Sequence, residues 1–189
     1  MTKNIMIVGV GGQGSLLASR IVGNAAIEAG YDVKVSEVHG MSQRGGSVVT
    51  YVRYGDKVES PVIGEGEADI ILSFELLESA RFLPFLRKGG KIITNTQKIN
   101  PMPVVTGQAS YPEELAEKIR QKGVNIIETD ALALAAKAGS EKAVNVVLIG
   151  CMARDCDFTK EQLLAATRAC VPAKLAEINL AAFELGYNA

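Results

Sequence analysis

The beginning of the chain has the apolar pattern of a strand, a turn and a helix. Ile5 to Val8 is a continuous apolar run, which is typical of a strand buried on both faces. Glycines follow, and Ser15 to Ala29 then has a composition compatible with a helix, which Gly30 is placed to end. Tyr31 to Val35 predicts a second strand, so that a β-α-β unit closes near Glu37. A right-handed crossover would make the two strands parallel neighbours.

A polar, glycine-containing segment from Val38 to Gly46 interrupts this rhythm. It has no apolar periodicity, so it predicts a loop. Ser47 to Tyr54 is rich in β-branched and aromatic residues, and Gly55-Asp56 separates it from Lys57 to Glu59. This pattern predicts an antiparallel hairpin attached to the parallel sheet.

Strands and helices then alternate again, and the chain ends in a helical tail. We expect an α/β fold: a Rossmann-like, mostly parallel sheet flanked by helices, with the antiparallel hairpin as an excursion and the helical C-terminal tail. No repeat or linker indicates a division, so residues 1–189 are expected to form a single domain. The remaining predicted elements are strands at Asp69–Ser73, Lys91–Thr94 and Val124–Glu128, and helices at Glu75–Arg87, from Pro112, at Ala131–Ala138, Lys142–Ala153, Lys160–Ala169 and Ala173–Leu185.

Charge and cysteine content exclude several classes of function. The chain has 20 basic and 21 acidic residues and a net charge of -1, so no overall field would draw it to nucleic acid or to a membrane. Cys151, Cys156 and Cys170 lack CxxC spacing, so neither a disulfide framework nor a zinc or iron–sulfur site is expected. No apolar stretch is long enough to span a bilayer. We therefore predict a reduced, cytoplasmic protein without nucleic-acid or membrane partners.

The glycines after the first predicted strand form a GxGxxG pattern, with Gly9, Gly11 and Gly14 at its fixed positions. In this pattern the first glycine permits a tight turn, the second lets backbone approach a phosphate, and the third allows close packing of helix on strand. Unpaired N–H groups at the helix start favour an anion. Gly12 completes this candidate binding turn. The alternative is a glycine turn that binds nothing.

Glu37 lies 23 residues after Gly14, at the predicted end of the second strand. The ribose-binding acid of an NAD site occupies a similar place. This spacing keeps open a stand-alone oxidoreductase that binds NAD or a flavin. A solvated or salt-bridged carboxylate at a strand end explains the same residue equally well.

The loop before the predicted hairpin concentrates hydrogen-bond donors. The chain's only histidine, His39, is followed by Ser42, Gln43 and Arg44, and these side chains precede Gly45-Gly46. Backbone N–H groups of such glycines form concave anion sites, and guanidinium groups bind phosphate or carboxylate. The loop therefore suits anion recognition. The alternative is a surface loop whose charges are only solvated.

Other groups of residues give weaker evidence for a metal or catalytic site. Glu65, Glu67 and Asp69 alternate at the entry to a strand, which splays them, so no metal site is predicted. The lone His39 has no GxSxG partner, and Cys151 lies in an apolar helical pattern that indicates core packing. With so few acid–base groups, we expect catalysis to be shared with other chains, and we assign no catalytic residue to this one. His39 and Arg44 are the candidates to contribute to a shared site.

Two strings of residues resemble the gamma-type subunit family of 2-oxoacid:ferredoxin oxidoreductases, and within it most of all the beta subunit of the indolepyruvate type. One is Gly9-Val10-Gly11-Gly12-Gln13-Gly14. The other, from Ser36 to Ser47, contains the particular string Glu-Val-His-Gly-Met-Ser-Gln-Arg-Gly-Gly. The likeness spans nearly the whole chain, since it extends to Pro61, Gly64, Ala68-Asp69, Asn145 and Glu177 to Phe183.

The resemblance implies a small subunit of an enzyme that converts a 2-oxoacid and coenzyme A to an acyl-CoA, carbon dioxide and reduced ferredoxin. In the indolepyruvate type the substrates are aryl pyruvates. The resemblance further implies that thiamine diphosphate, Mg and the iron–sulfur clusters belong to a larger partner subunit, and that no cofactor is tightly bound to this chain. The absence of a ferredoxin-type cysteine run agrees with that division.

The gamma domain of this family is associated with the coenzyme A side of the active site. We therefore expect the Gly9–Gly14 turn and the His39–Gly46 loop to face the partner's active site, with Arg44 on a phosphate or carboxylate. Two alternatives stay open: the stand-alone NAD- or flavin-dependent oxidoreductase, and a non-catalytic nucleotide-binding scaffold that uses the helical tail as its interface.

Overall fold

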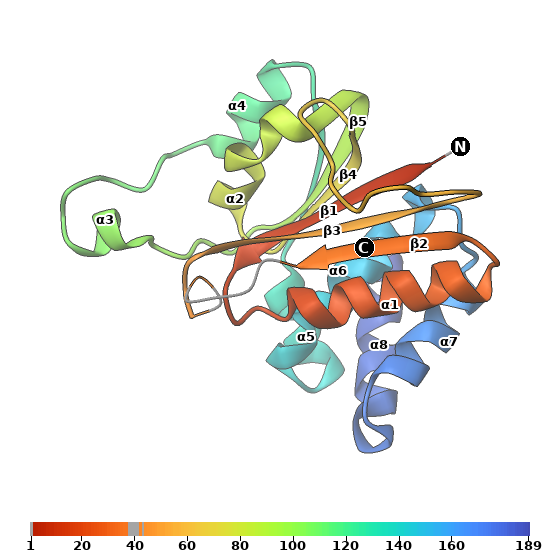
Figure 1. Cartoon of the computed structure of the whole chain (residues 1–189). Coiled ribbons are helices and arrows are strands. Elements are labelled where there is room, and N and C mark those ends of the chain that lie inside the picture. The colour runs from red at the N-terminus through yellow and green to blue at the C-terminus, as the bar shows by residue number, and fades with distance from the viewer. Residues whose placement is uncertain (1, 38–41, 43) are drawn as a thin grey trace.

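The computed structural model describes residues 2–37, 42 and 44–189. Among these residues, no helix combines the length and apolar content that crossing a bilayer requires. The elements follow one another as β1 Lys3–Val10, α1 Ser15–Glu28, β2 Asp32–Glu37, β3 Ser47–Gly55, β4 Ala68–Ser73, α2 Leu76–Arg81, β5 Leu86–Asn95, α3 Met102–Val105, α4 Leu115–Gln121, β6 Asn125–Thr129, α5 Ala131–Ala138, α6 Val144–Met152, α7 Lys160–Cys170 and α8 Ala176–Tyr187 (Figure 1).

The strands form one six-stranded sheet in the order β2-β3-β1-β4-β5-β6. The strands β1, β4, β5 and β6 are parallel neighbours, whereas β3 is antiparallel to both β1 and β2. Helices cover both faces of this sheet (Figure 1). The predicted α/β class, with a mostly parallel sheet and an antiparallel part, is therefore confirmed.

Two predictions about the antiparallel part are wrong. The strands β1 and β2 are not neighbours, because β3 lies between them and pairs with both. Residues 57–59 form no strand, so there is no separate hairpin. The strand β3 buries Val52 and Tyr54 in the larger core and packs Val49 on the other face, so it is suited to a central position. A segment with one apolar residue, such as Lys57-Val58-Glu59, is not suited to a central position in a sheet.

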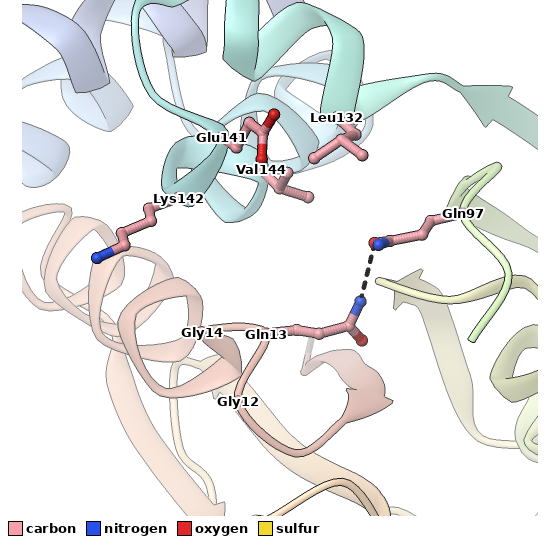
Figure 2. A pocket seen from close by; sticks show the side chains of 8 residues that line it. All are labelled: Gly12, Gln13, Gly14, Gln97, Leu132, Glu141, Lys142 and Val144. Atoms are coloured by element: carbon pink, nitrogen blue, oxygen red, sulfur yellow. Dashed lines mark hydrogen bonds between the residues drawn. The ribbon is translucent and has the colours of Figure 1, made fainter. Parts of the chain in front are cut away.

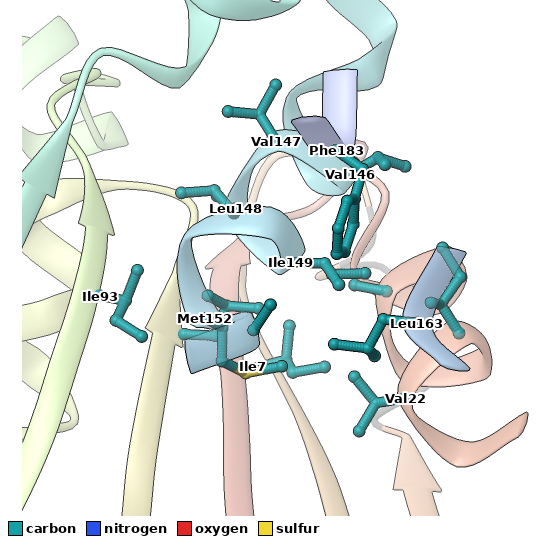
Figure 3. Packing of buried hydrophobic residues seen from close by; sticks show 14 of the residues in the cluster. Ile7, Val22, Ile93, Val146, Val147, Leu148, Ile149, Met152, Leu163 and Phe183 are labelled. Atoms are coloured by element: carbon teal, nitrogen blue, oxygen red, sulfur yellow. The ribbon is translucent and has the colours of Figure 1, made fainter. Parts of the chain in front are cut away.

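The strand β1 has apolar side chains on both faces, as its continuous apolar run predicts. Ile5 and Ile7 pack in the core under α1, α5, α6, α7 and α8. Met6 and Val8 pack in a second core under α2 and α4. Figure 3 shows the larger core, in which side chains of α6 lie between Ile7 and Ile93 of the sheet and the outer helices.

The predicted helix Glu75–Arg87 is correct at its start and wrong at its end. The helix α2 ends at Arg81, and a 3-10 turn that contains Pro84 follows. Gly89 and Gly90, which follow the predicted helix, lie inside β5, where Gly90 comes too close to Ala68 and Leu86 for a larger side chain. The four helices predicted in the tail are confirmed, with ends shifted by a few residues.

Candidate functional site

The glycine turn lies at the carboxyl end of β1, in the middle of the sheet. Gly14 caps α1 in the left-handed conformation, with φ 89°, and no side chain caps that helix. The N–H groups of Leu17 and Ala18 donate to the Gly14 carbonyl, at 3.2 and 3.3 Å. Among the described residues, those of Ser15 and Leu16 make no hydrogen bond and are left for a ligand. The connection after β1 leads to β2 on one side of the sheet, whereas the connection after the neighbouring β4 leads to β5 on the other side. Ligands bind at such a switch point of an α/β sheet.

Close packing explains why glycine occupies two positions of the motif. A Cβ on Gly9 would lie 2.9 Å from the Cβ of Phe74, which follows β4. A Cβ on Gly14 would lie 2.7 Å from the amide nitrogen of Asn145, a buried residue at the start of α6. That amide donates a hydrogen bond of 3.3 Å to the Gly14 carbonyl. Phe74 belongs to the same core as α6, so both close approaches lie on the face of the sheet that α6 covers.

The described end of the loop that was predicted to bind an anion, Arg44–Gly46, lies beside this turn because β3 runs antiparallel to β1. Ser47 pairs with Val10 in that register. The Gly11 N–H donates a hydrogen bond of 2.9 Å to the Gly46 carbonyl, and the Gly46 N–H donates one of 2.9 Å to the Ser42 carbonyl. The structure thus brings two motifs that are distant in the sequence into one site.

Arg44 and Gly45 are exposed beside this contact, and Gly45 has a φ of 97°. Within the described residues, no hydrogen bond or ion pair engages the Arg44 guanidinium. His39 and Gln43, which the sequence also suggested, lie outside the described residues.

Two cavities flank the glycine turn. The smaller has a volume of about 290 Å³ and is lined by Gly11, Gly12, Gly14, Ser15, Leu16, Val48 and Thr50. The larger has a volume of about 440 Å³ and is lined by Gly12, Gln13, Gly14, Gln97, Leu132, Glu141, Lys142 and Val144 (Figure 2).

Sequence reasoning missed Gln13, Gln97 and Lys142, which line the larger cavity. The side-chain oxygen of Gln13 accepts a bond of 2.7 Å from the Val10 N–H, and its side-chain nitrogen donates to the side-chain oxygen of Gln97 at 3.3 Å (Figure 2). Asn95 also donates to that Gln97 oxygen, at 3.3 Å. Because both bonds end on the oxygen of Gln97, its side-chain nitrogen has no acceptor among the described residues and can donate to a ligand.

These three residues differ in whether the sequence alone could have pointed to them. Gln13 belongs to the glycine string itself, so its place could have been predicted. Gln97 follows β5, and Lys142 lies in a 3-10 turn, Glu141–Ala143, before α6. Neither residue stands in a motif, and only the packing of the chain brings them to the turn.

Glu37 does not lie at the glycine turn. Its carboxylate accepts a hydrogen bond of 2.9 Å from the Ser19 hydroxyl, and it lines a separate cavity with Val33 and Val35. Because β3 separates β2 from β1, Glu37 is displaced by two strand spacings, roughly 9.5 Å, from the strand that carries the glycines. This displacement speaks against an NAD ribose site on Glu37.

The described residues do not offer the donor sets of a metal centre. Within them, no three His, Cys, Asp or Glu side chains come together. Glu67 and Asp69 instead accept hydrogen bonds of 2.8 Å from the backbone N–H groups of Gly64 and Asn4. The three cysteines are partly buried and unbridged. The described part of the chain therefore does not fit a magnesium ion or an iron–sulfur cluster.

The cysteines are expected to react slowly in the folded protein. Burial raises the pKa of the Cys156 thiol to about 11, and burial also raises the pKa of Cys151 and of Cys170. At pH 8 only about one Cys156 thiol in a thousand is ionised, and the thiolate is the reactive form. Labelling by iodoacetamide, followed by peptide mass spectrometry, should be slow at pH 8 and quicken about tenfold per pH unit. Chain unfolded in guanidinium is the control, and fast labelling of folded Cys156 would contradict the burial.

Residues 4–189 match the family described as pyruvate ferredoxin/flavodoxin oxidoreductase. The indolepyruvate oxidoreductase subunit IorB of Thermococcus kodakarensis is 46% identical over an alignment of 191 positions. The alignment covers 98% of this chain and 95% of that protein. The protein of the same name from Methanothermobacter thermautotrophicus is 37% identical, with 100% of this chain and 98% of that protein covered.

Solved structures show the same fold. The gamma subunit of a keto/oxoacid ferredoxin oxidoreductase from Geobacter sulfurreducens has a TM-score of 0.73 at 23% identity, with 98% of this chain and 96% of that chain covered. A 2-oxoglutarate:ferredoxin oxidoreductase from Magnetococcus marinus also has a TM-score of 0.73, at 16% identity, with 99% of this chain and 30% of that longer chain covered. On the family match over nearly its full length, this chain belongs to the pyruvate ferredoxin/flavodoxin oxidoreductase family.

Proposed function

We propose that this chain is the small subunit of an indolepyruvate-type 2-oxoacid:ferredoxin oxidoreductase. The complete enzyme would convert an aryl pyruvate and coenzyme A to an acyl-CoA, carbon dioxide and reduced ferredoxin. The relatives named indolepyruvate oxidoreductase subunit IorB support this subclass, since they are 37–46% identical over nearly the whole chain. The gamma subunits of pyruvate/ketoisovalerate oxidoreductases are similar at a lower level, for example 27% over 95% of this chain.

The observation that carries the proposal is the contact between Gly11 and Gly46, because it places an exposed arginine beside an uncapped helix start. Coenzyme A carries a diphosphate and a further phosphate, and backbone N–H groups and guanidinium bind such anions. The candidate residues are Gly9, Gly11, Gly12 and Gly14 of the turn and Ser42, Arg44, Gly45 and Gly46 of the loop. We assign the loop and the turn to coenzyme A at an active site that the partner completes.

The redox chemistry is assigned to a larger partner subunit. Thiamine diphosphate supplies carbanion chemistry at the 2-oxo carbon, and iron–sulfur clusters carry electrons to ferredoxin. The described residues lack the donor sets for Mg²⁺ or a cluster, which supports this division. The Magnetococcus structure supports it too, because this fold corresponds to 30% of a longer chain there. The unbridged cysteines fit a reducing cytoplasm.

The test is purification of the tagged chain from its native source. We expect a larger iron–sulfur protein to co-elute in fixed ratio, and the assembly to reduce ferredoxin when indolepyruvate and coenzyme A are supplied. The isolated chain should do neither. A chain that purifies alone and binds NADH or FAD would contradict the proposal and favour the stand-alone oxidoreductase, and one that binds a nucleotide without any co-eluting enzyme would favour the scaffold.

A further inference from the structure

A buried carboxylate lies directly behind the loop that carries Arg44. Glu78, in the first turn of α2, is only 4% exposed. One of its oxygens accepts a short hydrogen bond from the Ser47 hydroxyl, and the other accepts one of 3.1 Å from the Arg81 guanidinium. A buried acid is costly unless it is paired and hydrogen-bonded, so these two contacts are what make its burial tolerable.

Ser47 is the residue at which the loop joins β3. It is the first residue of β3 and directly follows Gly46. Val49, two residues further along β3, packs in the core under α2 and α4, so Ser47 lies on the face of the sheet that α2 covers. Glu78 therefore binds Ser47 on that face. The N–H of Gly11, just after β1, donates to the Gly46 carbonyl at 2.9 Å.

We propose that Glu78 is a positioning residue, which acts through Ser47 to hold the turn Arg44–Gly46 against the glycine turn. A hydrogen bond to an ionised carboxylate is roughly twice as strong as one between neutral groups, so the charge of Glu78 contributes directly to this hold. Arg81 balances that charge at the other oxygen. The holding role rests on geometry alone, and its effect on coenzyme A rests on the proposed function.

Glu75 offers a matched control. It is also buried, at 1% exposure, and it is the N-cap of the same helix. One of its oxygens accepts a bond of 3.1 Å from the Glu78 N–H, which the side-chain oxygen of glutamine can still accept. The other oxygen holds a different segment, since it accepts bonds of 3.0 Å from the Ile99 N–H and 2.6 Å from the Tyr111 hydroxyl. Those residues flank α3, on the extended segment that stands away from the sheet (Figure 1). Glu75→Gln should therefore loosen that segment and leave the Arg44 turn in place.

Tryptic cleavage of the full-length chain after Arg44 reports opening of this turn. Lys57, whose side chain is 78% exposed, provides the reference site in the same molecule. Relative to cleavage after Lys57, we expect Glu78→Ala and Ser47→Ala each to speed cleavage after Arg44 about tenfold, as loss of a charge-assisted bond implies. Glu78→Gln keeps a neutral acceptor and should give only about a threefold rise. Glu75→Gln should leave the ratio unchanged.

The double variant decides whether Glu78 acts through Ser47. If it does, Glu78→Ala combined with Ser47→Ala opens the turn no more than either change alone. Additive effects, or unchanged cleavage in both single variants, would overturn the inference. Ser47 is exposed, so Ser47→Ala keeps the test valid if Glu78→Ala folds poorly.

In the assembled enzyme, Glu78→Ala and Ser47→Ala should each raise the KM for coenzyme A about tenfold at unchanged kcat, and Glu75→Gln should not. A merely structural defect would lower kcat or the amount of enzyme instead. An unchanged KM with altered cleavage would overturn the link to coenzyme A. If the native assembly shows no turnover that depends on coenzyme A, the proposed function fails, while the cleavage ratios still decide the holding role.

Discussion

Gly186→Ala is expected to lower the melting temperature of this protein by roughly 6–12 °C, as about 3 kcal/mol of overpacking implies for its size. Gly186 lies in α8, where an added Cβ would come 2.8 Å from the carbonyl carbon of Val147 in α6 and closer still to its oxygen. Gly150 of α6 meets α8 in the same way, at 2.8 Å from the Tyr187 nitrogen. These neighbours are backbone, so the helices would have to separate.

The effect is large because α6 is the centre of the larger core. All its residues but Cys151 are buried, and its side chains face the sheet as well as α8 (Figure 3). A helix that is apolar on every side is stable only when it is enclosed. Moving α8 outward would therefore expose apolar surface as well as break a contact.

Gly23→Ala is the matched control, since Gly23 also lies inside a helix, α1. An added Cβ there would meet the side chains of Val35 at 3.7 Å and Val33 at 3.9 Å, which is ordinary contact. Alanine is favoured over glycine in a helix by about 0.5–1 kcal/mol, so the melting temperature should rise by roughly 1–4 °C. Thermal unfolding followed by circular dichroism measures both variants. Equal melting of Gly186→Ala and the native chain would contradict the close approach of α6 and α8.

Arg44→Ala in the assembled enzyme is expected to raise the apparent KM for coenzyme A by about 10- to 100-fold. A charged hydrogen bond to a phosphate contributes roughly 1.5–3 kcal/mol, and Arg44 has no other partner within the described residues. Because the lost contact stabilises bound substrate and transition state alike, kcat at saturating coenzyme A should be unchanged. Steady-state ferredoxin reduction at varied coenzyme A measures both constants.

Arg168→Ala supplies the control for lost surface charge. Arg168 is an exposed arginine of α7 that pairs with Glu177 at 3.1 Å, away from the glycine turn. Its replacement should leave the kinetics as they are, because an exposed ion pair contributes little. If Arg44→Ala leaves the KM for coenzyme A at the native value, the loop is not part of the coenzyme A site.

The resemblance carried by the glycine string and the Ser36–Ser47 string is confirmed by the family match. The candidate site was predictable in part, because both strings are local motifs whose backbone chemistry suits anions. That Gly11 and Gly46 meet depends on the pairing of β3 with β1, which the hairpin prediction did not contain. Glu78 and Lys142 could not be found in advance, since both come from helical segments without a motif.

The sequence by itself determined what local periodicity and backbone conformation encode. The apolar run of β1 implied burial on both faces, and the GxGxxG pattern implied a tight turn before a helix. Only the tertiary structure decided which strand lies beside β1, and which of two helical glycines tolerates a side chain. Gly23 and Gly186 look alike in the sequence, and only the packing of α8 on α6 distinguishes them. The physical reason is that side-chain patterns specify local conformation and burial, whereas contacts between distant segments are selected by the packing of the whole core.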